Sequence, residues 1–383
     1  MPFFNDTVHR FGPGADFFAL YQAGHSALHG ESIYRFTPGT TVIPYAYPFR
    51  YLPISAYTVG ALLTLVPPAV AYALWLGVCE VVLLTNVRVT YTRTGKGLRG
   101  ALLAALWLVF TPYFLELWVG QFTFLLGSML FWSVLAYQKG RGKTAQGWWI
   151  ASVLWKPASL LWVPVWLRER RFWPGLLLCG LLLLGNLVYF RFFPADWSVF
   201  ADTNFQPVPT WHAGNVGLSG LIYHFTGPAG FRPVRLILTV LLLVPALWVT
   251  LRPRSFAGTA LLRRRAGAAE PVESRCPFWL LAALWTCLYF LIYKDVWEHH
   301  LTLLLPFLVL GLWYAPSRLL AALTVLLALP SPFILYDVPG LGFNVDPQPY
   351  FSAGVSLLHH SWRAVPLMVL YLHWLALAWR GKP

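Results

Sequence analysis

The chain has 383 residues, of which 58% are hydrophobic and 11% charged, and its formal net charge is +14. This composition is too apolar for a soluble domain of that size. The four cysteines lie within or beside apolar runs without paired spacing, which excludes a disulfide framework or a cysteine metal site.

Repeated apolar runs, each of about 16–22 residues, match the thickness of a bilayer's hydrocarbon core. Only helices and closed barrels satisfy the backbone in lipid, and these runs do not alternate as barrel strands do. We therefore expect an all-α, polytopic membrane protein, formed as a single membrane domain over residues 1–383.

Residues 1–66 are expected to form a first outer loop, because the first 50 residues contain no continuous apolar segment and no signal peptide. Asp16 precedes an amphipathic stretch that ends at Gly30, which predicts an interfacial helix lying on the bilayer. A shorter amphipathic piece covers about 53–65. Asp16 has two interpretations, an N-cap that accepts backbone N–H bonds or a general base at the membrane surface.

Roughly ten membrane spans follow this loop. Residues 67–250 hold a first group of spans, 251–276 an Arg-rich loop, and 277–383 the C-terminal spans. The apolar runs lie near 67–87, 100–119, 122–137, 147–167, 173–193, 233–250, 277–293, 301–314, 317–335 and 364–380.

Basic residues cluster in alternate connections, beginning with Arg88–Arg99, Lys139–Lys143, Arg168–Arg171 and Arg252–Arg275. By the positive-inside rule these connections are cytoplasmic. A nucleic-acid-binding face would not be divided among short loops between membrane spans, so we expect no nucleic-acid partner.

One apolar run, 147–167, breaks this alternation, because the connections on both sides of it are basic. The segment "WKPAS" at 155–159 lies in its middle, and proline disrupts a helix interior. A hairpin of two short helices, with Lys156 at its tip, would return the chain to the cytoplasmic side. The alternative is one kinked helix and an imperfect charge rule.

With the hairpin, one side of the membrane collects the polar segments: residues 1–52, "GQ" at 120–121, Lys156, the loop 194–232, "KDVWEHH" at 294–300 and the loop 336–363. A chemically rich outer face indicates an extracytoplasmic active site in a cell membrane.

Several of these motifs, in this order, resemble one enzyme family. They are "DFFALYQAGHSALHGESIY" from Asp16, "YPFRYLP" at 47–53, "GQ", "KP", "GNVGLSG" at 214–220 and "WEHH" at 297–300. The chain resembles the polyprenyl-phosphate-dependent glycosyltransferases of the GT-C type, and within them the mannosyltransferase-like family 87, over about residues 14–310. Members usually carry a membrane helix before the loop that holds the residue matching Asp16. Thr123, two places after the "GQ" motif, stands where an Asn is common.

The resemblance implies transfer of a sugar, mannose by default, from a polyprenyl phosphate to a lipid, glycan or protein hydroxyl, with inversion. Asp16 matches the family's catalytic aspartate. A phosphate leaving group requires cations, so the outer basic residues are its expected ligands: Arg50, Lys156, Lys294, His299 and His300. Expected sugar or acceptor contacts are Tyr21, Gln121, Asn215 and Glu298.

Several of these residues also have a structural interpretation. Arg50 could snorkel at the interface, and Lys156 could be solvated in a turn. Glu298 could favour the dipole of the helix that follows it, and Asn215 could cap a short helix. His299 and His300 lie about 100° apart on an α-helix, so we expect one of them to face the cavity. Their spacing does not match H-E-x-x-H, and no metal or other cofactor is expected.

Two other classes of function compete with the transferase. A transporter or flippase of a lipid-linked substrate would also use broken helices and an intramembrane lysine, although we find no internal repeat. A non-catalytic envelope scaffold is the third class. Loss of sugar transfer from a polyprenyl phosphate on substitution of Asp16 would separate the first class from the other two.

Overall fold

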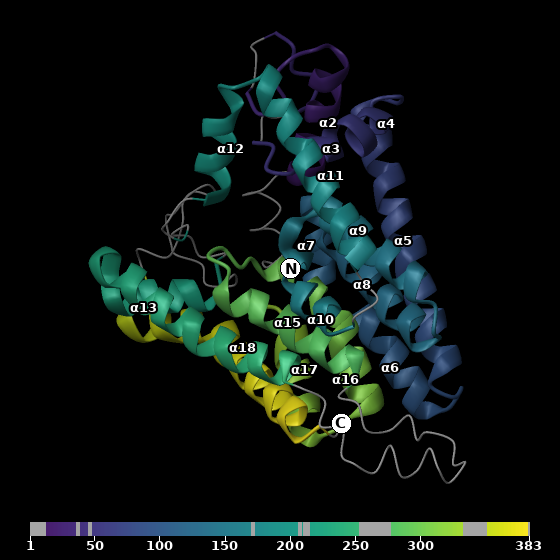
Figure 1. Ribbon diagram of the computed structural model, residues 1–383, viewed down its shortest axis with the longest axis vertical. Helices are drawn as coiled ribbons and strands as arrows, with labels where there is room; N and C mark the ends of the chain where they lie inside the picture. The colour runs from purple at the N-terminus through teal and green to yellow at the C-terminus, as the bar shows by residue number, and fades with distance from the viewer. Residues whose placement is uncertain are drawn as a thin grey trace.

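The computed structural model describes residues 13–35, 39–44, 48–169, 173–205, 209, 215–252, 277–331 and 351–381 (Figure 1). The described residues form helices joined by short connections, and their only β-type pairing is an isolated bridge between Asn215 and Trp297. The expected all-α architecture is confirmed for this part of the chain. The N-terminal elements are α2 (Ala15–Leu28), α3 (Pro53–Ser55), the π-helix η1 (Ala56–Gly60) and α4 (Ala61–Leu63).

The remaining helices follow the apolar runs of the sequence. The first group contains α5 (Pro68–Arg93), α6 (Leu98–Val109), α7 (Pro112–Val119), α8 (Thr123–Gln138), α9 (Gly142–Trp155), the 3₁₀-helix η2 (Pro157–Trp162), α10 (Val163–Arg168), α11 (Trp173–Phe192), α12 (Asp196–Phe205) and α13 (Leu218–Leu251). The C-terminal group contains α15 (Phe278–Ile292), the 3₁₀-helix η4 (Glu298–Leu303), α16 (Leu305–Tyr314), α17 (Arg318–Ala328) and α18 (Ala353–Arg380).

Four apolar stretches of helix are long enough to cross a membrane: Pro68–Arg93, Leu98–Val119, Trp173–Phe192 and Leu218–Leu251. Shorter apolar helices, among them α8, α15 and α17, supply further hydrophobic segments. Length and composition identify a helical membrane protein, and the expected number of about ten spans stays a prediction.

The chain folds back at Lys156, as the hairpin prediction requires. Lys156 has extended backbone angles between α9 and η2. The Trp149 indole donates to the Ser159 carbonyl at 2.8 Å, and the Trp149 and Trp166 rings lie 5.8 Å apart. In one straight helix, residues 17 apart would be separated by about 25 Å. Together with the extended backbone at Lys156, these contacts favour the hairpin over one kinked helix.

Helix α2 is packed against other helices, and its expected position at the bilayer interface stays a prediction. Almost all of its residues are buried. It crosses η1 closely at two glycines, since a Cβ added to Gly24 would lie 2.1 Å from the Gly60 carbonyl carbon. The N-cap expectation for Asp16 is wrong: Gly14 occupies the cap, and Asp16 lies in the first turn without a capping bond.

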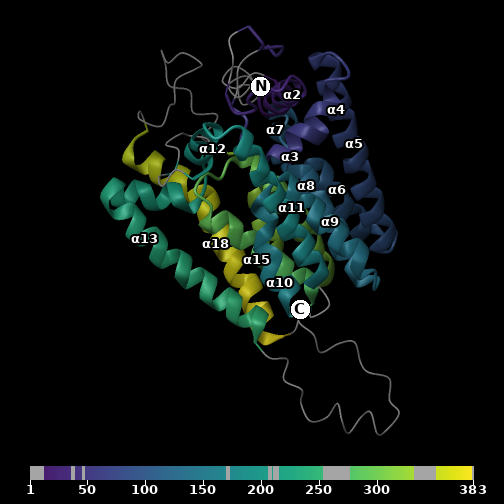
Figure 2. The same ribbon diagram turned by 45° about the horizontal axis from the view of Figure 1, so that its top comes forward.

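The helices form two groups that meet at α15 and α16 (Figures 1 and 2). Helices α5, α6, α8 and α9 lie together on one side, with α2–α4 above them. Helices α13 and α18 run side by side on the other side and pack against α15. Short η4 contacts α7 and α8 on one side and α16 on the other, which places the "EHH" segment where the two groups meet.

Parts of the predicted loops lie outside the described residues. These include Arg170 and Arg171, most of the Arg-rich loop 251–276, and large parts of the loops 194–232 and 336–363.

Candidate active site

The start of α2 is docked on the end of α7, and this contact places Asp16. The Gly14 amide donates to the Trp118 carbonyl at 2.7 Å. Gly120 ends α7 with a φ of 70°, and a Cβ on it would lie 2.6 Å from the Phe17 Cβ. Only glycine combines this left-handed conformation with so close an approach. The "GQ" motif therefore brings Gln121 against the first turn of α2.

Asp16 and Gln121 are joined in a buried chain of hydrogen bonds. The Gln121 Nε2 donates to Asp16 Oδ2 at 2.9 Å. Its Oε1 accepts from the Tyr51 hydroxyl at 3.0 Å and from the Phe122 amide at 3.2 Å. Because two donors hold the amide oxygen, the amide nitrogen is directed to the carboxylate. One carboxylate oxygen is thus held, as a general base requires.

Asp16 is 5% exposed. Burial raises the pKa of its carboxyl from 3.8 to about 6, although the charges of Arg50 and Lys156 and the Gln121 bond act in the opposite direction. A carboxylate with a pKa in this range is a stronger base than an exposed one and is still ionised at neutral pH. Arg50 and Lys156, two of the predicted phosphate ligands, therefore lie within electrostatic reach of Asp16, the predicted base.

Lys156 and His300 meet across the site. The Lys156 Nζ lies 3.3 Å from the His300 Nε2, so the hairpin tip and η4 converge. The imidazole rings of His299 and His300 lie 4.6 Å apart. The Nε2 of half-buried His299 has no hydrogen-bond partner among the described residues. Because η4 is a 3₁₀-helix, the two side chains diverge by about 120° instead of the 100° expected for an α-helix.

We expect His300 to matter more than His299 for donor binding, because only His300 contacts Lys156. His300→Ala should raise the donor KM about tenfold, the scale of one hydrogen bond to a charged group. His299→Ala should change it by about threefold or less. Steady-state transfer at matched protein levels in membranes measures both. Equal effects of the two substitutions would contradict this assignment.

The loop 293–297 is fixed by Asn215. Its Nδ2 donates to the Lys294 carbonyl and to Asp295 Oδ1, both at 3.2 Å, and its Oδ1 accepts from the Val296 amide at 3.1 Å. Lys294 is buried and forms an ion pair with Asp295 at 3.2 Å. These bonds position the loop that leads to η4. A sugar contact of Asn215 and a phosphate contact of Lys294 stay predictions.

Glu298 faces α18, where it forms a buried ion pair with Arg363 and accepts from the Ser331 amide at 2.9 Å. Glu298 therefore has a structural role, and its expected contact with a sugar or acceptor stays a prediction. The "KDVWEHH" cluster thus divides: Glu298 anchors η4 to α18, and His300 faces the site.

Tyr21 lies farther along α2 from Asp16, and its hydroxyl donates to the Val66 carbonyl at 2.9 Å.

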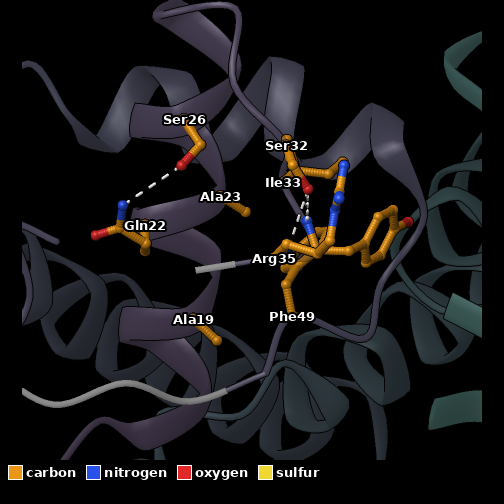
Figure 3. Close-up of a pocket in the computed structure, with 9 residues that line it drawn as sticks. Ala19, Gln22, Ala23, Ser26, Ser32, Ile33, Arg35 and Phe49 are labelled. Atoms are coloured by element: carbon orange, nitrogen blue, oxygen red, sulfur yellow. Dashed lines mark hydrogen bonds between the residues drawn. The ribbon is translucent and has the colours of Figure 1, made fainter. Parts of the chain in front are cut away.

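A small cavity lies between α2 and residues 32–35, with Ala19 and Ala23 on one wall and Arg35 on the other (Figure 3). Its volume of about 10 Å³ accommodates roughly one water molecule. A sugar ring does not fit there.

Sequence reasoning missed two groups at the site. Tyr51 lies inside the "YPFRYLP" motif and holds Gln121. Glu116, an acid within the apolar run 100–119, is fully buried in α7 and interacts electrostatically with Lys156. An ionisable residue inside a membrane span is itself a signal of function, and this signal could have identified Glu116 from the sequence.

Within the described ranges, no three His, Cys, Asp or Glu side chains gather as a metal-binding group.

The family profile described as glycosyltransferase family 87 matches residues 49–272, more than half of the chain. The chain belongs to glycosyltransferase family 87. The matched segment contains Arg50, Gln121, Lys156 and Asn215, whereas Asp16 and the "EHH" segment lie outside it. No match is found among curated proteins. The predicted family is thereby confirmed, and the protein is a glycosyltransferase with membrane-spanning helices.

Proposed function

We propose that this family 87 glycosyltransferase transfers a hexose, mannose in the first instance, from a polyprenyl-phosphate donor to a hydroxyl of an extracytoplasmic acceptor. The observation that carries the proposal is the buried Asp16 carboxylate, held by Gln121 and within electrostatic reach of Arg50 and Lys156. A base beside cations matches a reaction in which an alcohol loses a proton and a phosphate leaves as an anion.

In the proposed step, the acceptor oxygen forms a bond to the anomeric carbon as the bond from that carbon to the phosphate oxygen breaks. The acceptor proton passes to Asp16, and the electron pair leaves with the polyprenyl phosphate. A single displacement inverts the anomeric centre. Lys156, Arg50 and His300 stabilise the charge that develops on the departing phosphate.

The donor is amphipathic, and the fold matches that requirement. Long apolar helices with exposed apolar side chains, such as Leu74 and Val81 on α5, would place the site beside the bilayer that holds the prenyl chain. The polar groups of the site lie at helix ends and breaks. We place this side of the molecule on the extracytoplasmic face, as the basic connections indicate.

The test is transfer of a radiolabelled sugar from the polyprenyl phosphate to membrane acceptors by the purified protein. Label that becomes covalently joined to an acceptor supports the proposal. Label that crosses the bilayer while still joined to the prenyl phosphate would instead identify a flippase.

A further inference from the structure

Tyr293 joins the end of α15 to the "KDVWEHH" segment, and its backbone is fixed on both sides. Its amide donates to the Tyr289 carbonyl at 2.8 Å, which closes the last turn of α15, and its carbonyl accepts from the Ser219 hydroxyl at 3.2 Å. The Tyr293 ring is stacked on the Tyr289 ring, with the centroids 4.9 Å apart and the planes at 22°. The phenol side chain therefore has a defined direction before any substrate binds.

The Tyr293 ring also approaches the predicted phosphate ligands. Its centroid lies 6.4 Å from that of the His300 ring. Because the His300 Nε2 lies 3.3 Å from the Lys156 Nζ, only one side chain separates Tyr293 from the hairpin tip. Arg50 acts electrostatically on the same phenol. Tyr293 thus borders the group of side chains that is expected to hold the donor phosphate.

The Tyr293 hydroxyl forms no hydrogen bond within the described part of the chain, and it is not fully enclosed. Other tyrosines around the site differ in this respect. The hydroxyls of Tyr21, Tyr51 and Tyr72 donate to protein oxygens at 2.9, 3.0 and 2.8 Å. A polar group in a mostly buried position ordinarily has a partner, because an unpaired one is unfavourable. The half-buried Tyr293 phenol is therefore a donor that is available to a bound molecule.

An uncharged donor is well suited to a phosphate that already lies beside cations. Two of these cations repel each other, since Arg50 disfavours a positive charge on Lys156. A phenol carries its proton at neutral pH, and it can donate to a phosphate oxygen without adding a further positive charge. The two non-bridging oxygens of a phosphodiester offer several acceptor positions for such a bond.

We propose that Tyr293 is a donor-binding residue whose hydroxyl donates a hydrogen bond to the phosphate of the polyprenyl-phosphate donor. The proposal rests on the proposed function, because that function supplies the phosphate. We assign the contact to the phosphate and not to the sugar, because the side chains around Tyr293 are the expected phosphate ligands. Polyprenyl phosphate without a sugar should therefore use the same contact.

The experiment compares the purified wild type with Tyr293→Phe, which removes the hydroxyl and keeps the ring that stacks on Tyr289. Tyr314→Phe is the matched control, because it removes a phenol hydroxyl whose partner, Gln138, belongs to the protein. Equilibrium binding is measured with the labelled polyprenyl-phosphate sugar and, in competition, with polyprenyl phosphate that carries no sugar. We expect Tyr293→Phe to raise both dissociation constants about tenfold, the scale of one hydrogen bond to a charged group. Tyr314→Phe should leave both unchanged.

Thermal unfolding separates this role from a structural one. Since the Tyr293 hydroxyl bonds to no described residue, its removal should leave the Tm as in the wild type. Unchanged dissociation constants in Tyr293→Phe would overturn the proposal, and so would a lowered Tm or an effect confined to the sugar-bearing lipid. A wild type that binds both lipids but transfers no label would instead overturn the proposed function, while the binding result would still decide the role of Tyr293.

Discussion

Asp16→Asn is expected to lower the rate of sugar transfer by about 10²-fold or more, the usual scale of general base catalysis. The amide keeps the size of the side chain and can still bond to Gln121, but it cannot accept the acceptor's proton. Donor binding should survive, because cations hold the phosphate. The measurement is kcat for transfer together with equilibrium binding of the labelled donor.

Loss of folding should not complicate this variant. Since burial raises the pKa of Asp16 to about 6, the fold favours the protonated form, and the associated stability is lost as the pH rises through that value. An uncharged side chain therefore should not destabilise the protein at neutral pH. Asp202→Asn, on the exposed face of α12, is the matched control and should leave kcat unchanged. Near-normal transfer by Asp16→Asn would show that Asp16 has no role as base.

Lys156→Ala is expected to have the complementary effect and weaken the donor complex. A hydrogen bond to a charged group contributes about 1.5–3 kcal/mol, which corresponds to roughly a 10- to 100-fold rise in the donor dissociation constant. Lys156 is half-buried at the hairpin tip, with its Nζ beside His300, so another surface lysine cannot replace it.

Binding of the labelled donor to detergent-purified variants measures this effect. Lys143→Ala is the matched control, because Lys143 lies on the same helix, α9, and is exposed near its start. It should bind the donor as the wild type does. Donor affinity that is unchanged in Lys156→Ala would remove Lys156 from the phosphate site.

The sequence was informative where a local pattern has one physical meaning. "WKPAS" predicted the break at Lys156, because a proline inside an apolar run between two basic connections favours a reversal of the chain. Pro112 lies inside the expected span 100–119. The structure ends α6 at Val109 and begins α7 at Pro112, and together the two helices form one apolar stretch, Leu98–Val119, that is long enough to cross a membrane.

Partners that are remote in sequence could not be predicted in this way. Glu298 pairs with Arg363, and Asn215 bonds to residues 80 positions away. The motifs "WEHH" and "GNVGLSG" contain no signal that identifies these partners. The amphipathic pattern of α2 predicted a helix but not its burial against η1 and α7, because packing of this kind depends on tertiary contacts such as the Gly24–Gly60 approach.

The identity of the group that titrates during transfer is the most direct test of the mechanism. The donor is a phosphodiester and does not titrate near neutrality. Burial, together with the charge of Lys156, lowers the pKa of His299 to about 3 and lowers that of His300 well below its ordinary value. Asp16 has a pKa of about 6, and as the proposed base it is the group that we expect to control the acidic limb.

The measurement is kcat/KM for transfer of labelled sugar from the polyprenyl phosphate as a function of pH, since this ratio reports the ionisations of the free enzyme. We predict a plateau at neutral pH and a loss of about tenfold for each unit of pH below 6, because only the ionised carboxylate accepts the proton. In Asp16→Asn the residual activity should show no such limb. An acidic limb that persists near pH 6 in Asp16→Asn, or a wild-type rate that does not change from about pH 5 to 8, would contradict the assignment of Asp16 as the base.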